Sequence, residues 1–229
     1  MIVKDFVRKE VASPWMVLAL ALLFPGCAAS HRSMLDPSEY ENTIRIACVG
    51  DSITFGYGIK NRNKYSYPAV LQKLLGNQYE VRNFGVSGAT VLKNGDLSYW
   101  ELPAFQSAAE FSPDAVIIKL GTNDTKPQNW QYRDEFEADY SQFVDFFLDL
   151  PSRPKVWLCY PVPVYRSEWG IKGDLLEKEI QPTIKLISWK KRTPVINLFK
   201  GLSNVPDFFP DGIHPDDDGL RVLAESYDG

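Results

Sequence analysis

The stretch Val49-Gly50-Asp51-Ser52-Ile53-Thr54-Phe55-Gly56 joins an apolar run to a polar turn. Residues 44–49, which lead into it, are rich in β-branched and apolar side chains, as is typical of a buried strand. A buried strand that ends in Gly-Asp-Ser places a small polar side chain at its carboxyl end, where open α/β sheets bind their ligands. Ser52 is therefore a candidate nucleophile, although Gly, Asp and Ser also form ordinary turns.

Further strand-like runs follow this one, and helix-like segments alternate with them. We expect strands near residues 44–49, 79–84, 115–120, 156–160 and 195–198, and helices near 67–76, 102–110, 136–148, 174–188 and after 216–218. Pro182 should kink or divide the helix that contains it, and the aromatic residues at helical spacing in 136–148 should pack in the core. Such alternation favours a five-stranded parallel sheet covered on both faces, in the flavodoxin-like order 2-1-3-4-5.

The composition is that of a globular protein. The 229 residues are 45% hydrophobic and 13% aromatic, which is enough for a sizeable core and argues against disorder. The net charge is -4 with both signs interspersed, so the chain lacks the basic footprint of a nucleic-acid-binding protein. The sequence contains two histidines, His31 and His214. Histidine-dependent chemistry in the folded part must therefore use His214.

The amino terminus has the pattern of an export signal. Basic residues precede an apolar run at 15–24, which is too short to span a bilayer comfortably, and Gly26-Cys27 ends the run. This pattern resembles a bacterial lipoprotein signal in which Cys27 becomes the lipidated first residue. We expect a signal at 1–26, a tether at 27–42, a folded domain at 43–229, and a cell-envelope location with membrane contact only through the lipid anchor. A plain secretory signal or an uncleaved apolar anchor are the alternatives.

The other two cysteines lie in predicted strands. Cys48 belongs to the first strand and Cys159 to the fourth. The order 2-1-3-4-5 puts the third strand between them, and two strand spacings are too far for a disulfide between in-register residues. We expect two buried thiols that act as small hydrophobic side chains.

Three later stretches contain what a serine nucleophile requires. His214 can take the hydroxyl proton, and Asp211, three residues earlier, can orient the imidazole. The backbone N–H groups of Ser52 and Gly88 and the side-chain amide of Asn123 can stabilise an oxyanion. Each feature also has a structural reading: the glycine loop at 85–88 could cradle a phosphate, but the full G-x-G-x-x-G pattern is missing. Asn123 could begin a helix, and His214 could be an ordinary loop residue.

Taken together, these stretches resemble the four signature blocks of the SGNH (GDSL) hydrolase superfamily. The blocks are Gly50-Asp51-Ser52, Gly88 in its glycine loop, Gly121-Thr122-Asn123-Asp124 and Asp211-x-x-His214, in the family's order. The resemblance implies a three-layer α/β/α fold and metal-independent ester hydrolysis. It also implies Ser52, His214 and Asp211 as the catalytic triad, and Ser52, Gly88 and Asn123 as the oxyanion hole.

The residues favour no metal and no cofactor. The Asp216–Asp218 run could bind calcium, but it is more typical of the start of a helix. No combination of cysteines and histidines in the sequence suggests a zinc site.

The substrate is indicated less directly. Segment 118–130 resembles the branch of the family that contains sialate and xylan O-acetylesterases, so we expect a small acylated carbohydrate substrate. Aromatic residues near the expected active edge are candidates for sugar contacts, or for packing: Tyr57, Trp100, Trp130, Tyr165 and Trp169. The alternatives are a lysophospholipase or thioesterase-like hydrolase and, in another class, a non-catalytic glycan-binding lipoprotein.

Overall fold

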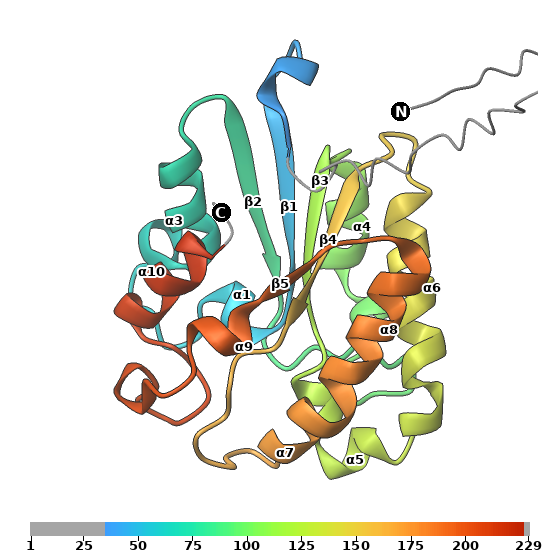
Figure 1. The fold of residues 1–229 in the computed structure, drawn as a ribbon, viewed down its shortest axis with the longest axis vertical. Helices are drawn as coiled ribbons and strands as arrows, with labels where there is room; N and C mark the ends of the chain where they lie inside the picture. The colour runs from blue at the N-terminus through green and yellow to red at the C-terminus, as the bar shows by residue number, and fades with distance from the viewer. Residues whose placement is uncertain (1–34, 227–229) are drawn as a thin grey trace, which may run out of the picture. The chain divides into compact units, whose positions relative to one another are not determined.

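The computed structural model describes residues 35–226. Five parallel strands form one sheet in the order β2-β1-β3-β4-β5, which confirms the predicted topology (Figure 1). The strands are β1 (Ile44–Gly50), β2 (Tyr79–Gly85), β3 (Ala115–Lys119), β4 (Lys155–Tyr160) and β5 (Val195–Asn197). The predicted strand ends agree within one residue, and the last strand stops at Asn197 because Leu198 begins a helix.

The described helices include all five that the sequence pattern predicts, together with short ones that it does not predict. They are α1 (Ser52–Phe55), α2 (Arg62–Tyr65), α3 (Tyr67–Leu75), α4 (Pro103–Glu110), α5 (Pro127–Trp130), α6 (Phe136–Leu148), α7 (Gly173–Leu175), α8 (Gln181–Lys191), α9 (Leu198–Gly201) and α10 (Asp217–Glu225). Short 3-10 turns are η1 (Pro37–Glu39), η2 (Tyr99–Glu101), η3 (Asn123–Thr125), η4 (Arg133–Glu135) and η6 (Pro206–Phe208). Asp216 caps α10 by accepting a hydrogen bond from the Gly219 N–H, as expected for this acidic run.

Pro182 divides its helix as predicted. The π-helical turn η5 (Leu176–Ile180) separates α7 from α8, and Pro182 lies in the first turn of α8. A proline cannot donate a backbone hydrogen bond, and its ring crowds the carbonyl four residues earlier. The wider π-helical turn is a local rearrangement of the kind that relieves such crowding.

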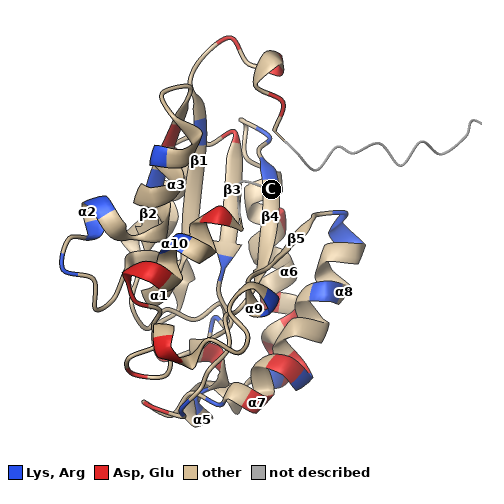
Figure 2. Ribbon diagram, turned by 60° about the vertical axis from the view of Figure 1, so that its left-hand side comes forward, with Lys and Arg blue, Asp and Glu red and all other residues tan. Residues whose placement is uncertain are grey.

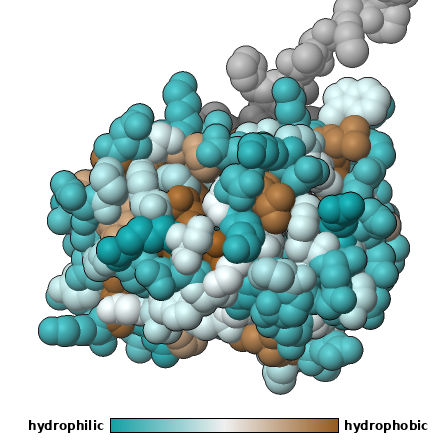
Figure 3. All heavy atoms as spheres, turned by 90° about the horizontal axis from the view of Figure 1, so that it is seen from below, coloured by the Kyte–Doolittle hydropathy of each residue, from teal (hydrophilic) through white to brown (hydrophobic). Residues whose placement is uncertain are grey.

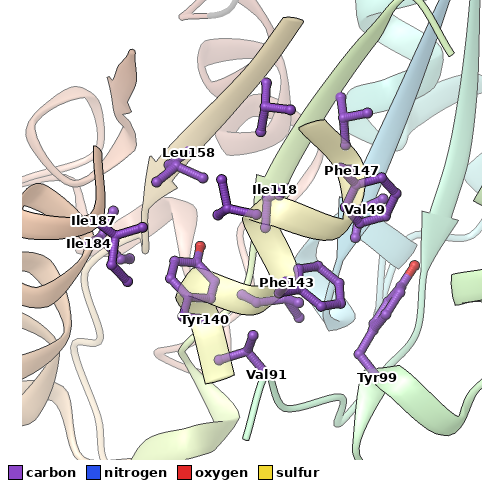
Figure 4. Packing of buried hydrophobic residues seen from close by; sticks show 14 of the residues in the cluster. Val49, Val91, Tyr99, Ile118, Tyr140, Phe143, Phe147, Leu158, Ile184 and Ile187 are labelled. Carbon is purple, nitrogen blue, oxygen red and sulfur yellow. The ribbon is translucent and has the colours of Figure 1, made fainter. Parts of the chain in front are cut away.

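Two apolar layers hold the sheet between its helices. Alternate strand residues point to opposite faces, so Val49 packs with α4, α6 and α8, whereas Cys48 packs with α3, α9 and α10. The predicted aromatic stripe of α6 lies in the first of these layers, where Phe143 and Phe147 pack near Val49 and Ile118 (Figure 4). This arrangement is the three-layer α/β/α fold implied by the family resemblance.

The cysteines occupy their predicted places. Cys48 on β1 and Cys159 on β4 are both buried, and β3 lies between their strands. Burial raises the pKa of the Cys48 thiol, which disfavours the reactive thiolate.

The predicted signal at 1–26 and the candidate lipid-attachment residue Cys27 lie outside the described residues. Of the predicted tether, residues 35–42 are described: Asp36 caps η1, and Glu39 forms an ion pair with Lys155 at 3.4 Å. This end of the tether therefore contacts the folded domain. Within residues 35–226, no helix combines the length and the apolar composition that crossing a bilayer requires.

Candidate active site

The ends of the neighbouring strands β2, β1 and β3 are level, and this brings distant segments together. Gly50 at the end of β1 is in register with Gly85 of β2 and with Lys119 of β3. Ser52, Gly88 and Asn123 follow these three strand ends within a few residues. Strand register therefore places the candidate nucleophile and the candidate oxyanion donors at one edge of the sheet.

Ser52, His214 and Asp211 form a continuous hydrogen-bonded chain. The Ser52 Oγ lies 2.8 Å from His214 Nε2, and His214 Nδ1 lies 2.7 Å from Asp211 Oδ2. A carboxylate can only accept hydrogen bonds, so Nδ1 carries the ring proton and Nε2 accepts from the serine hydroxyl. This is the tautomer in which the imidazole can take the serine proton. The geometry brings together all three residues that the sequence predicts as the triad.

The carboxylate of Asp211 is held by its own loop. Its Oδ1 accepts hydrogen bonds from the backbone N–H groups of Ile213 at 2.9 Å and His214 at 2.7 Å. Partial burial acts to raise the pKa of Asp211, but the hydrogen bonds from His214 and Ile213 outweigh it and hold the pKa below its ordinary value. Asp211 is therefore ionised near neutral pH, as a residue that orients a histidine must be.

A tight turn presents the Ser52 hydroxyl. Asp51 caps α1 by accepting from the Ile53 N–H at 3.0 Å, so the helix starts directly at Ser52. A Cβ at position 50 would lie 2.1 Å from Thr54 Oγ1 and 2.7 Å from the Lys119 carbonyl oxygen. Only glycine fits there, and this explains why the turn begins with Gly50.

A buried ion pair lies beside this turn, and sequence reasoning did not find it. Lys119 Nζ lies 2.9 Å from both carboxylate oxygens of Asp51 and 3.2 Å from Thr122 Oγ1. Both charged side chains are 0% exposed. The ammonium group thus links the segment before Ser52 to the segment before Asn123. The one available signal was a lysine at the end of an otherwise apolar strand, and it does not identify the partner.

One pocket of about 230 Å³ is lined by Ser52, Gly88, Asn123 and His214. We call it the catalytic pocket. Gly88 has a φ of +87°, a left-handed conformation that glycine adopts without strain. One hydrogen of the Asn123 amide is donated to the Ala89 carbonyl at 3.1 Å, which fixes the amide and leaves its second hydrogen available. The candidate oxyanion donors and the candidate nucleophile therefore share the same pocket.

Asp124 fixes the loop that follows Gly88. Its buried Oδ1 accepts from the backbone N–H groups of Val91 and Leu92, each at 2.9 Å. Burial raises the pKa of Asp124 to about 7, although these two hydrogen bonds act in the opposite direction. Asp124 therefore joins the Asn123 segment to the segment after Gly88 through buried bonds.

The predicted sugar-contacting aromatics divide into two groups. Tyr57 and Trp169 line the catalytic pocket and lie next to the His214 ring, with centroid distances of 4.5 Å and 5.2 Å. Trp100 and Trp130 instead pack against the core, and Trp100 Nε1 donates to the Val91 carbonyl. The hydroxyl of Tyr165 donates a hydrogen bond to the Leu202 carbonyl and accepts one from the Val205 N–H. Trp100, Trp130 and Tyr165 therefore do not line the catalytic pocket, and they pack against the core instead.

The lining of the catalytic pocket also includes residues that sequence reasoning did not single out: Ser87, Lys126 and Ile171. Figure 3 shows the molecule of Figure 1 from below, which is the side where the strands end and the loops that follow them lie. The surface seen there is mostly hydrophilic, and hydrophobic residues appear as small separate areas (Figure 3). In residues 35–226, no three His, Cys, Asp or Glu side chains are grouped to hold a metal ion.

The segments that build this site match a known family. The model of the GDSL-like lipase/acylhydrolase family matches residues 48–222, from the first block to beyond the last. The chain belongs to this family. The resemblance to the SGNH (GDSL) superfamily is thereby confirmed.

Relatives of this GDSL-family chain include esterases. An acetylxylan esterase of Xylanibacter ruminicola is 41% identical over 207 residues, which are 82% of this chain and 43% of that protein. This chain therefore spans less than half the length of that relative.

Two solved structures share the fold. One is a carbohydrate acetylesterase from Sinorhizobium meliloti, with TM-score 0.68 and 21% identity over 80% of this chain and 96% of that one. The other is an aryl esterase from M. smegmatis, with TM-score 0.64 and 23% identity over 81% and 98% of the two chains.

Proposed function

We propose that this protein is a serine esterase that removes O-acetyl groups from carbohydrates. The observation that carries the proposal is the hydrogen-bonded chain from Ser52 through His214 to Asp211, which opens into the same pocket as Gly88 and Asn123. The similarity to an acetylxylan esterase supports a carbohydrate substrate.

In the proposed reaction, His214 Nε2 takes the proton of Ser52 as Oγ attacks the acetyl carbonyl carbon. The carbonyl oxygen becomes negative and accepts hydrogen bonds from the N–H groups of Ser52 and Gly88 and from the Asn123 amide. Asp211 stabilises the imidazolium that forms. The imidazolium then gives its proton to the sugar oxygen, the C–O bond breaks, and the sugar leaves an acetyl-serine.

Water completes the cycle by the same route in reverse. His214 takes a proton from a water molecule, which attacks the acetyl-serine carbonyl. The oxyanion donors stabilise the second tetrahedral intermediate. The proton returns to Ser52 Oγ as acetate departs, and the enzyme is restored.

The size of the pocket supports a short acyl group. The catalytic pocket measures about 230 Å³, below the roughly 300–1,000 Å³ of sites for larger ligands. A long acyl chain would need an extended apolar groove, whereas the visible edge is mostly hydrophilic (Figure 3). Tyr57 and Trp169 offer flat ring faces beside His214, which suit the apolar face of a sugar ring.

Two measurements test this function. A fluorophosphonate probe should label wild-type protein at Ser52 and fail to label Ser52→Ala. Rates on p-nitrophenyl esters should be highest for acetate and fall steadily towards decanoate. A preference for acyl chains longer than butyrate would contradict the acetylesterase assignment, and an unlabelled Ser52 in folded protein would favour a non-catalytic binding protein.

We also propose that the chain is exported and held at the cell envelope through a lipid on Cys27. The proposal rests on the sequence pattern of residues 15–30. Mass spectrometry of protein extracted from membranes should find diacylated Cys27 at the mature amino terminus. The Cys27→Ala variant should lose that lipid, and an unprocessed or unmodified wild-type terminus would contradict the proposal.

A further inference from the structure

A second pocket adjoins the catalytic pocket and shares two of its walls. It measures about 380 Å³, and both pockets are lined by Tyr57 and His214. We call it the leaving-group pocket. Tyr57 is 44% exposed and its ring lies 4.5 Å from the His214 ring, so the two side chains together form the partition between the pockets.

The chemistry of ester cleavage determines which side of the catalytic pocket the sugar occupies. The carbonyl oxygen must face Gly88 and Asn123, because these supply the oxyanion donors. The leaving oxygen must lie near His214 Nε2, because the imidazolium gives it the proton. The sugar therefore extends towards His214 and Tyr57. The leaving-group pocket lies on the side of the site formed by these two residues.

The lining of the leaving-group pocket is acidic. Its charged residues are all carboxylates: Asp211, Asp216, Asp217 and Asp218. Of these, Asp211 orients His214, Asp216 caps α10, and Asp218 pairs with Arg221 at 3.0 Å. Asp217 is exposed in the first turn of α10, where Figure 2 shows acidic residues in red. Within the described chain, no lysine or arginine belongs to this lining, whereas Lys126 lines the catalytic pocket.

We propose that the leaving-group pocket binds the sugar that carries the ester, and that its carboxylates select uncharged sugars over anionic ones. This inference rests on the proposed function, because only a carbohydrate ester has a sugar as its leaving group. Carboxylates accept hydrogen bonds from sugar hydroxyls, and the Tyr57 ring and two prolines provide apolar contact. A uronic or sialic acid would bring a carboxylate close to these like charges. At a separation of about 4 Å in a water-like medium, each such repulsion lowers binding about fivefold.

The test uses two substrates that differ only in charge. One is a mono-O-acetylated methyl glucuronoside, and the other is the same sugar with its carboxylate converted to the primary amide. For wild-type protein at low ionic strength, kcat/KM for the amide should exceed that for the acid by about fivefold or more. The ratio should fall towards one at about 1 M salt, because screening shortens the range of the repulsion to about 3 Å.

A charge change at one position makes the test specific. Asp217→Lys should lower the amide-to-acid ratio at least about fivefold, and Asp217→Asn should lower it less. Asp149→Lys is the matched control, because Asp149 follows α6 at the end remote from the strand-end loops and the net charge changes equally. The control should keep the wild-type ratio. Each kcat/KM is divided by that of the same variant on p-nitrophenyl acetate, which corrects for differences in the fraction of active protein.

Two results would overturn the inference separately from the proposed function. Equal kcat/KM for acid and amide in wild-type protein, with no response to either Asp217 variant, would show that this pocket does not select by charge. A shift in Asp149→Lys as large as that in Asp217→Lys would assign the effect to the net charge of the protein. Failure to cleave either sugar acetate, or an acetylated xylo-oligosaccharide, despite activity on p-nitrophenyl acetate would refute the proposed function and remove the basis for a sugar subsite.

Discussion

Replacing Lys119 with methionine tests whether the buried ion pair beside Ser52 is essential to the fold. The side chains of Lys119 and Asp51 are 0% exposed, and the ammonium nitrogen lies 2.9 Å from both carboxylate oxygens. Methionine fills most of the volume but leaves the Asp51 carboxylate buried without its cation. Breaking a buried pair in this way costs about 3–5 kcal/mol. That is a large part of the roughly 5–15 kcal/mol that stabilises a typical domain.

The assay is urea unfolding of four proteins that form a double-mutant cycle. Lys119→Met should lower the free energy of unfolding by about 3–5 kcal/mol. Adding Asp51→Asn should restore most of this loss, because the uncompensated charge is removed while an amide oxygen remains to accept from the Ile53 N–H. The control is Lys190→Met, which breaks an exposed pair with Glu137 whose side chains are 45% and 44% exposed. It should cost at most about 1 kcal/mol.

The reasoning would be refuted if Lys119→Met cost no more than the Lys190→Met control. It would also fail if the double variant were as unstable as Lys119→Met alone. Activity on p-nitrophenyl acetate gives a second readout. Because the pair adjoins the segments of Ser52 and Asn123, folded Lys119→Met should have a reduced kcat, and the double variant should recover part of it.

Three further predictions concern the site itself. Ser52→Ala should lower kcat at least about 10⁴-fold with little change in melting temperature; a large loss of stability would assign the residue a structural role instead. Asn123→Ala should lower kcat about 10²–10³-fold with a smaller effect on KM, and an unchanged kcat would exclude it from the oxyanion hole. Burial raises the pKa of Asp124 to about 7, above the value of about 4 in the unfolded chain. Between about pH 4 and pH 7 the unfolded chain therefore loses a proton that the folded protein keeps, so the wild-type free energy of unfolding decreases progressively. The stability of Asp124→Asn relative to wild type should therefore increase over this interval in urea unfolding, and a pH-independent difference would contradict the shifted pKa.

Local sequence patterns predicted the main elements of the fold because they reflect backbone preferences and hydrophobic periodicity, which depend on neighbouring residues. The β-branched run at 44–49 forms a strand wherever both its faces are buried, and Pro182 divides a helix whatever surrounds it. The order of the strands followed from alternation and from the handedness of crossovers. The hydrogen-bonded candidate triad was also predictable, because a serine nucleophile needs a base and His214 is the histidine in the predicted folded domain.

The roles of the other polar and aromatic residues depended on contacts that no local pattern encodes. Lys119 reads as the end of an apolar strand, yet its charge is matched by Asp51, 68 residues earlier in the chain. Tyr57 and Trp100 were both predicted to lie near the active edge, but Tyr57 lies beside His214 whereas Trp100 packs against the core.

The sequence by itself determined the five strands, the main helices, the strand order and the candidates for the nucleophile and its base. The tertiary structure alone decided which charges are buried together, which rings face the pocket, and that a second, acidic pocket adjoins His214. The physical reason is one of range. Propensity and hydrophobic periodicity act over a few neighbouring residues, whereas burial, ion pairing and pocket shape are set by atoms that meet only after the chain has folded.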